Sequence, residues 1–285
     1  MSKKVLTGIK PTGMPHIGNY FGAIKPALEL AQQYDARYFI ADYHALNTVR
    51  DPSEMRGLVR EVAAAWLACG LDPERVIFYR QSDVPETFEL TTALMAFTPK
   101  GVMNRAHAYK AKVADNSEAG EDIDSGVTMG LFTYPVLMAA DILLFDTELV
   151  PVGTAQVQHL EMAADIAEAL NRNYNQPLLV VPKAFVSVET QTIVGLDGRK
   201  MSKSYNNSIP LFCEEKELKK MIMKIVSDST PVEAPKDPDS SHIFSLYKLF
   251  ATPDQRDDFA RRLRAGGMGW GTAKGELFEL MNQHL

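Results

Sequence analysis

Short apolar strands alternate with helical segments along the first 208 residues, and this alternation constrains the fold more than any other feature of the chain. The predicted strands are Val5–Thr7, Tyr38–Ala41, Val76–Tyr79 and Leu149–Val152. Helical periodicity follows each strand, over residues 19–33, 52–68, 87–97, 134–145 and 155–170, and a polar loop precedes residue 134. This order predicts an α/β fold, a parallel sheet with helices on both faces. Ligands of such sheets bind beyond the carboxyl ends of the strands.

The character of the sequence changes near residue 208. Beyond this point only helical patterns are present, over residues 214–226, 241–250, 254–264 and 273–284, separated by Pro and Gly. We therefore predict two domains, an α/β domain at 1–208 and a small all-helical domain at 209–285.

The charge of the chain is unevenly distributed. Its 285 residues include 30 Lys and Arg against 36 Asp and Glu, a net charge of −6, which is a mild argument against a nucleic-acid partner. However, five acidic residues and no basic ones lie in the segment 113–126. Basic residues cluster elsewhere, at Lys219, Lys220, Lys224, Arg261, Arg262 and Arg264. Local patches decide nucleic-acid binding. Our hypothesis is that the acidic segment is a loop that forms a mobile flap near the active site.

The cysteines and the apolar runs indicate the compartment. Cys69 and Cys213 are the only cysteines, so a disulfide scaffold and a thiolate zinc site are excluded. No apolar run is long enough for a signal peptide or a membrane span. We expect a cytoplasmic protein that does not bind membranes.

The first motif that could carry chemistry is the turn after the first predicted strand, at residues 7–19. It places a strand end, two small turn residues and a helix start in succession, which suits a phosphate group. Gly18 would allow close approach of a ligand, while His16 and Asn19 supply hydrogen-bond donors. A purely structural turn with a helix cap is an equally good interpretation of this segment alone.

A second motif, at residues 198–204, has the sequence GRKMSKS. Lys200 and Lys203 flank small hydroxyl residues in a loop that begins with glycine. Ammonium groups in such a loop could neutralise charge that develops on transferring phosphates. Taken alone, a solvated basic loop is the simpler interpretation.

The third motif is an apolar helix that contains a single charge. Tyr134, Met138 and Asp141 share one face of the predicted helix 134–145, and Asp141 is its only charged residue. A buried carboxylate is costly unless it is paired. Asp141 could therefore form a structural ion pair, or it could await a donor at the end of an apolar pocket. The indole N–H group is such a donor.

Together, the motifs resemble those of a known family. HIGN at 16–19 and KMSKS at 200–204 resemble the two signature motifs of class I aminoacyl-tRNA synthetases. The stretch YPVLMAADILLF, followed by LVPVGTAQVQHLE, is similar to the tryptophanyl branch of that family over nearly the whole chain. The resemblance implies a Rossmann-type catalytic domain at 1–208 and a helical domain at 209–285 that binds the tRNA anticodon. It also implies that relatives continue a few dozen residues past Leu285.

The resemblance assigns roles to individual residues. His16 and Asn19 would lie along the triphosphate, and Lys200 and Lys203 would be catalytic at the pyrophosphate. The implied ATP site consists of Lys10, Pro11, Thr12, Gly18, Asn19, Gly153, Thr154, Ala155, Ile193, Val194, Lys200, Met201, Ser202, Lys203 and Ser204. The implied tryptophan site consists of Leu6, His44, Tyr134, Met138, Asp141, Val150, Val152 and Gln156. In it, Asp141 accepts the indole N–H, while Tyr134 and Gln156 hold the α-amino group.

The implied activity is ATP-dependent tryptophan–tRNA ligation by a homodimer. Tryptophan reacts with ATP to form tryptophanyl-adenylate, and the acyl group then passes to tRNA(Trp). Mg²⁺ enters with ATP, and we expect no protein-only metal site and no tightly bound prosthetic group. Three alternatives are a tyrosine-specific synthetase, a small-metabolite nucleotidyltransferase, and a synthetase-like paralogue that binds tryptophan or RNA without charging tRNA.

Overall fold

The computed structural model describes residues 2–11, 13–152, 156–185 and 193–284. Its backbone contacts divide the chain into two compact units. The first consists of Met1–Gly13 and Pro26–Glu189, and the second of Met14–Lys25 and Thr190–Leu285. This division differs from the boundary that we predicted near residue 208, because side chains from residues 14–25 and 193–208 pack with the C-terminal helices.

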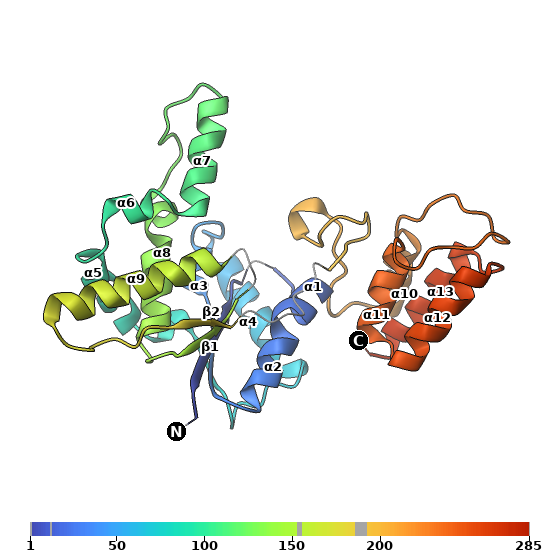
Figure 1. Ribbon diagram of the computed structural model, residues 1–285, viewed down its shortest axis with the longest axis horizontal. Helices are drawn as coiled ribbons and strands as arrows, with labels where there is room; N and C mark the ends of the chain where they lie inside the picture. Colours follow the sequence, from blue (N-terminus) through green and yellow to red (C-terminus); the bar gives the residue numbers. More distant parts are fainter. Residues whose placement is uncertain (1, 12, 153–155, 186–192, 285) are drawn as a thin grey trace. The chain divides into compact units, whose positions relative to one another are not determined.

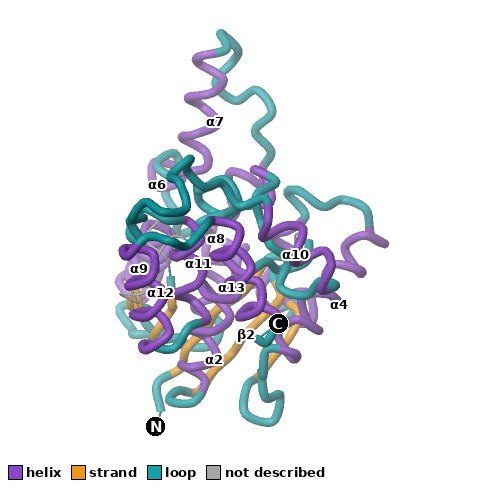
Figure 2. The backbone as a smooth tube through the Cα atoms, turned by 90° about the vertical axis from the view of Figure 1, so that its right-hand side faces the viewer, coloured by secondary structure: helices purple, strands orange, loops and turns teal. Residues whose placement is uncertain are grey.

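The first unit contains a five-stranded parallel sheet with the order β3-β2-β1-β4-β5 (strands orange in Figure 2). The strands are β1 Lys4–Ile9, β2 Asp35–Ile40, β3 Ile77–Arg80, β4 Leu149–Pro151 and β5 Lys183–Phe185. The predicted parallel sheet is confirmed. The prediction did not include β5, which has only three residues, all of them exposed, and is too short to show a periodic pattern.

Helices cover both faces of this sheet, as predicted. Because side chains alternate along a strand, Tyr38 and Phe39 of β2 point to opposite faces. Tyr38 contacts Trp66 of α4 (Pro52–Ala68) and donates a 2.5 Å hydrogen bond to the carbonyl oxygen of Ala27. Phe39 stacks on Tyr79 and joins an apolar cluster that includes residues of α5 (Glu86–Met95), α8 (Met129–Leu143) and α9 (Val157–Tyr174).

The helices of the first unit begin where capping residues place them. Asp51 caps α4 by accepting hydrogen bonds from two backbone N–H groups of the first turn, and Thr128 caps α8 in the same way at Leu131. As a result α8 begins at Met129, five residues before the predicted start. The helices are α2 Lys25–Ala31, which begins in the second unit, α3 Asp42–Ala45, α4 Pro52–Ala68, α5 Glu86–Met95, α6 Lys100–Met103, α7 His107–Glu118, α8 Met129–Leu143 and α9 Val157–Tyr174.

The prediction of a loop before α8 is wrong for residues 107–118, which form α7 (green, projecting from the first unit in Figure 1). The turn after α7 is held by hydrogen bonds. The amide of Asn116 donates to the carbonyl oxygens of Ile123 and Ser125, and the Tyr109 hydroxyl donates to Asp124 at 2.9 Å. The acidic segment 113–126 is therefore half helix and half tethered turn. Its role as a flap stays a hypothesis.

The second unit is helical around one apolar core. Its helices are α1 Ile17–Asn19, which continues as a π-helical turn at Tyr20–Ile24, α10 Glu215–Met223, α11 His242–Phe250, α12 Pro253–Ala265 and α13 Trp270–Asn282. The single helix predicted over 19–33 is thus divided into three segments. Ile17 and Met201 pack into the same core as Ile222, Phe259 and Leu277. No helix in the described part of either unit is long and apolar enough to cross a membrane.

Candidate active site

In the first unit, the buried carboxylate of Asp141 forms the centre of a hydrogen-bond network. Asp141 lies on α8 with 2% of its surface exposed. The Gln81 side-chain nitrogen donates to both of its oxygens, at 2.7 and 2.9 Å, and His44 Nε2 lies 2.9 Å from Oδ2. Burial raises the pKa of the Asp141 carboxyl, while the bonds from His44 and Gln81 oppose that rise.

Gln81 is a member of this network that the sequence analysis missed. It lies in the 3₁₀ turn Gln81–Asp83 that follows β3, and its side chain is completely buried. The side-chain oxygen of Gln81, Oε1, accepts a 3.1 Å hydrogen bond from the backbone N–H of Tyr43, which fixes the direction of the amide donor in the same side chain. Its position directly after a strand, where α/β folds place ligand contacts, was the signal that could have identified it.

The residues predicted to line the indole slot come together in one apolar cluster. Leu6 of β1, Val150 of β4 and Val152 after β4 are buried, and Met138 of α8 packs against the same cluster. Leu6 and Val150 come from the adjacent strands β1 and β4, Val152 directly follows β4, and Met138 comes from the helix that carries Asp141.

The two residues predicted to hold an α-amino group lie on neighbouring helices. Tyr134 of α8 forms a hydrogen bond through its hydroxyl to Nε2 of His159 on α9. Gln156 lies at the N-cap position of α9 with an exposed side chain. His159 did not appear in the sequence analysis, because a lone histidine in an amphipathic helix gives no functional signal.

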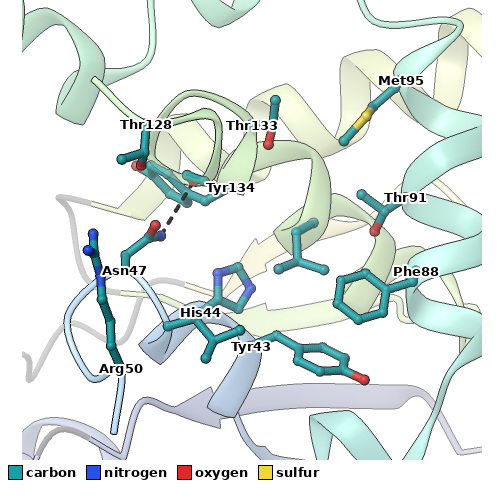
Figure 3. A pocket seen from close by; sticks show the side chains of 13 residues that line it. Tyr43, His44, Asn47, Arg50, Phe88, Thr91, Met95, Thr128, Thr133 and Tyr134 are labelled. Atoms are coloured by element: carbon teal, nitrogen blue, oxygen red, sulfur yellow. Dashed lines mark hydrogen bonds between the residues drawn. The ribbon is translucent and has the colours of Figure 1, made fainter. Parts of the chain in front are cut away.

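A cavity of about 370 Å³ borders this network (Figure 3). Its wall consists of α3 and the turn after it, α5 and the start of α8. His44 and Tyr134 both line it, so the two side chains face the cavity and also take part in hydrogen bonds within the unit. Asn47 closes one side by donating a 3.4 Å hydrogen bond to the carbonyl oxygen of Gly130.

In the second unit, the HIGN motif forms a helix cap. His16 Nδ1 accepts a 3.2 Å hydrogen bond from the backbone N–H of Asn19, and the Asn19 side chain accepts a 3.0 Å bond from the backbone N–H of His16. Burial, together with the charge of Lys203, lowers the pKa of His16 to about 4. His16 is therefore neutral at pH 7 and carries its ring proton on Nε2. This nitrogen can donate to an anion.

Gly18 is required for the packing of this cap. A Cβ atom at Gly18 would lie 2.9 Å from two ring atoms of His16 and 3.5 Å from Cβ of Met201. The glycine therefore allows the His16 ring to lie against the helix. The same turn is joined to the segment after KMSKS by two backbone hydrogen bonds, from Ile17 to Ile209 and from Leu211 to Pro15.

The KMSKS segment is anchored at its middle and exposed at its lysines. Met201 is buried in the core, and its N–H donates a 2.8 Å hydrogen bond to the carbonyl oxygen of Ile193. The side chains of Lys200 and Lys203 are exposed. Asn207, a third residue that the sequence analysis missed, is buried beneath the loop and accepts a 2.8 Å bond from the backbone N–H of Ser202.

Asn207 also fixes the turn before the lysines. Its amide donates to Asp197 Oδ1 at 2.6 Å and to the carbonyl oxygen of Lys200 at 3.1 Å. The bonds from Asn207 and Arg199 lower the pKa of Asp197 to about 2. Val194 pairs with Lys200 across the same turn. The HIGN and KMSKS motifs therefore form one structure within the second unit.

The remaining residues of the predicted ATP site are divided between the units or lie outside the described residues. Ser204 is exposed and its hydroxyl lies 2.8 Å from that of Ser202, in the second unit. Lys10 and Pro11 follow β1 in the first unit. Thr12, Gly153, Thr154 and Ala155 lie outside the residues that the structure describes.

Comparison with known proteins agrees with these motifs. The family model of class I tRNA synthetases (W and Y) matches residues 2–285. Among curated proteins, tryptophan–tRNA ligases of Pseudomonas putida and Bordetella pertussis are 53% and 54% identical to this chain, with all of it aligned. The chain spans 64% of the length of each of these relatives.

A solved structure gives a match that covers more of the relative. The tryptophanyl-tRNA synthetase of Campylobacter jejuni, complexed with ADP and tryptophan, aligns with 99% of this chain and 85% of its own, at 45% identity and a TM-score of 0.88. Both motif-bearing units are within the aligned region. The chain belongs to the class I tRNA synthetase family of tryptophan and tyrosine, on its tryptophanyl branch.

Proposed function

We propose that this chain activates L-tryptophan with ATP and transfers the product to tRNA(Trp). The observation that carries the proposal is the buried Asp141 carboxylate on an otherwise apolar helix, held in place by Gln81 and His44. The relatives named tryptophan–tRNA ligase support the same reaction.

The hydrogen bonds of Asp141 support its role as the indole acceptor. A carboxylate offers about four lone-pair positions, two on each oxygen. Oδ2 accepts from Gln81 and from His44, whereas Oδ1 accepts from Gln81 alone among the residues that the structure describes. Oδ1 thus retains a position for one more donor, such as the N–H of an indole ring seated among Leu6, Met138, Val150 and Val152. A phenylalanine ring in the same slot would leave that position unsatisfied and would be rejected.

The second unit supplies the groups that suit ATP. Neutral His16 offers an N–H to a phosphate oxygen, and Asn19 lies in the same helix cap. Lys200 and Lys203 supply positive charge from the KMSKS loop. Mg²⁺ would enter with ATP as part of the substrate. The tryptophan carboxylate attacks the α-phosphorus and pyrophosphate leaves, so no protein nucleophile is needed. We propose that the protein acts by positioning the reactants and stabilising charge.

The lysines on α10 and at its C-cap, Lys224, are the better candidates for tRNA contact in the helical unit. Arg262 is already bonded to Glu276, at 2.7 and 2.5 Å, and to Asp258, and Arg264 pairs with Asp239. These partners reduce the charge that the α12 arginines offer to phosphates. We propose that the domain assigned to residues 209–285 contacts tRNA mainly through Lys220 and Lys224.

A homodimer in the cytoplasm completes the proposal. The exposed apolar side chains of Leu46, Phe88 and Met95 line the cavity of Figure 3 and support a contact between two copies of the chain there. Sedimentation of the wild-type chain and of Phe88→Asp would test this: the wild type should sediment as a dimer and the variant as a monomer.

The decisive test of the function is amino-acid-dependent ATP–pyrophosphate exchange with all twenty amino acids, followed by charging of tRNA. Exchange with tryptophan and charging of tRNA(Trp) are expected. Exchange with tyrosine would instead identify a tyrosine-specific enzyme. Exchange without charging would indicate a paralogue that no longer serves protein synthesis.

A further inference from the structure

His159 is a buried, polar side chain beside the predicted tryptophan site. It lies on α9 with 4% of its surface exposed, and its Nε2 forms a hydrogen bond with the hydroxyl of Tyr134. The other ring nitrogen, Nδ1, is buried and has no hydrogen-bond partner among the residues that the structure describes. The polar interactions of this ring are therefore directed at Tyr134.

The chemistry of the two groups determines the direction of this hydrogen bond. A phenol O–H is a better donor than a neutral ring N–H, and an imidazole nitrogen is a better acceptor than a phenol oxygen. The favoured arrangement places the shared hydrogen on Tyr134 and the ring proton of His159 on Nδ1.

The surroundings of His159 keep it neutral. Burial lowers its pKa, and so do the charges of His107 on α7, His44 on α3 and Lys10 after β1. The His107 ring meets that of His159 edge to face, with centroids 6.4 Å apart, and Tyr134 packs on it at 5.2 Å. Burial also raises the pKa of Tyr134, so the phenol keeps its hydrogen.

We propose that His159 is a positioning residue for the α-amino group of the substrate. By accepting the Tyr134 hydroxyl hydrogen on Nε2, it leaves the lone pairs of the Tyr134 oxygen facing the ligand as an acceptor for an ammonium group. The proposal rests on the proposed function, in which Tyr134 contacts the α-amino group of tryptophan.

The reason is that an ammonium group can only donate. A Tyr134 hydroxyl free to turn could point its own hydrogen at the ligand and oppose binding. A protonated His159 would have the same effect, because its Nε2–H would occupy an oxygen lone pair and turn the Tyr134 hydrogen outward. Neutral His159 excludes both arrangements, so binding of an ammonium group depends on this ring.

Three ligands separate this role from a structural one. L-Tryptophan and tryptamine carry the ammonium group, and indole-3-propionate has the indole ring and the carboxylate without it. In His159→Leu, the dissociation constants of tryptophan and tryptamine should rise at least tenfold, while that of indole-3-propionate changes less than twofold. In His159→Gln, whose side-chain oxygen can accept from Tyr134, the affinity for tryptophan should return to within about threefold of wild type.

If His159→Leu weakened the binding of all three ligands equally, His159 would only support the pocket. If the affinity for tryptophan were unchanged in this variant, His159 would not act on the ammonium group. Either result overturns the proposal. A wild-type chain that binds none of the ligands would overturn the proposed function as well.

The wild-type chain provides a second test that does not depend on the folding of a variant. Because the pKa of His159 is lowered from its ordinary value of 6.5, the affinity for tryptophan relative to that for indole-3-propionate should stay constant above pH 6.5 and fall only at lower pH, where protonation of His159 removes the acceptor. Protonation of groups that contact only the indole ring affects both ligands equally and cancels in this comparison. Parallel pH profiles for the two ligands, together with normal tryptophan affinity in His159→Leu, would contradict the inference.

Discussion

The side-chain amide of Gln81 donates hydrogen bonds to both carboxylate oxygens of Asp141, 60 positions away in the sequence, at 2.7 and 2.9 Å. Gln81 is itself oriented by the backbone N–H of Tyr43. The carboxylate therefore points in a fixed direction before any ligand arrives. An acceptor that is already fixed loses little conformational entropy when a ligand binds, and it discriminates strongly against rings that lack a donor.

The first prediction concerns the charge of Asp141. Asp141→Asn should lower kcat/KM for tryptophan-dependent ATP–pyrophosphate exchange by about a hundredfold or more, the scale of a lost charge-assisted hydrogen bond. The Asn amide would also place a donor against the donors of Gln81 or His44. Asp165→Asn, an exposed position on α9, is the matched control and should keep wild-type kinetics. Near-normal activity in Asp141→Asn would mean that another group selects the ring.

The second prediction concerns Gln81. Gln81→Met keeps a similar volume but removes the donor, so the buried carboxylate loses hydrogen bonds to both oxygens. We expect a loss of about 1–3 kcal/mol in the free energy of unfolding, measured in urea, and about a tenfold fall in kcat/KM for tryptophan. An unchanged urea midpoint and unchanged kinetics would show that His44 alone suffices to hold Asp141.

The third prediction uses two glycines of the same N-terminal segment. Gly18→Ala would place a methyl group 2.9 Å from the His16 ring and must displace it, whereas Gly22→Ala would meet no atom within 4 Å. Gly18→Ala should therefore reduce the exchange rate at least tenfold, about the effect of misplacing one charge-stabilising donor. Gly22→Ala should stay within twofold of wild type. Equal exchange rates in the two variants would show that the position of His16 does not matter for the reaction.

The fourth prediction concerns the lysines of the KMSKS segment. If Lys200 and Lys203 stabilise charge that develops during phosphate transfer, Lys200→Ala and Lys203→Ala should each lower kcat by about a hundredfold. KM for tryptophan should change little, because both lysines are exposed on a loop of the second unit. Lys220→Ala, on α10, serves as the control in exchange assays without tRNA. A rise in KM with unchanged kcat would assign the lysines to ground-state binding.

The fifth prediction follows from the lowered pKa of His16, which is about 4. Below its ordinary pKa of 6.5, the unfolded chain takes up a proton at His16 that the folded chain does not. This stabilisation is complete above pH 6.5 and is lost as the pH falls toward 4. Between pH 7 and pH 5 the wild type should lose about 2 kcal/mol more stability than His16→Asn, which keeps a capping side chain without titrating. Urea unfolding at both pH values measures this difference, and parallel losses would contradict it.

Much of the architecture could be predicted from local patterns. Four of the five strands, the apolar character of α8 and the helical C-terminal region follow from hydrophobic periodicity, which is a property of neighbouring residues. The errors occurred where that signal is weak. Strand β5 has only three residues, too few to show a periodic pattern, and α7 is too polar to differ from a loop in its sequence pattern. The start of α8 was misplaced because the Thr128 cap decides it.

The sequence by itself determined which chemical groups are present and in what order: a HIGN turn, a KMSKS loop and one carboxylate in an apolar helix. Only the tertiary structure decided what those groups contact. It brought Gln81 and His44 to Asp141, Asn207 to the turn before the lysines, and His159 to Tyr134. It also packed residues 14–25 with the C-terminal unit. The physical reason is that a buried polar side chain must find its partners wherever the folded chain places them, and that distance along the sequence does not indicate where this will be.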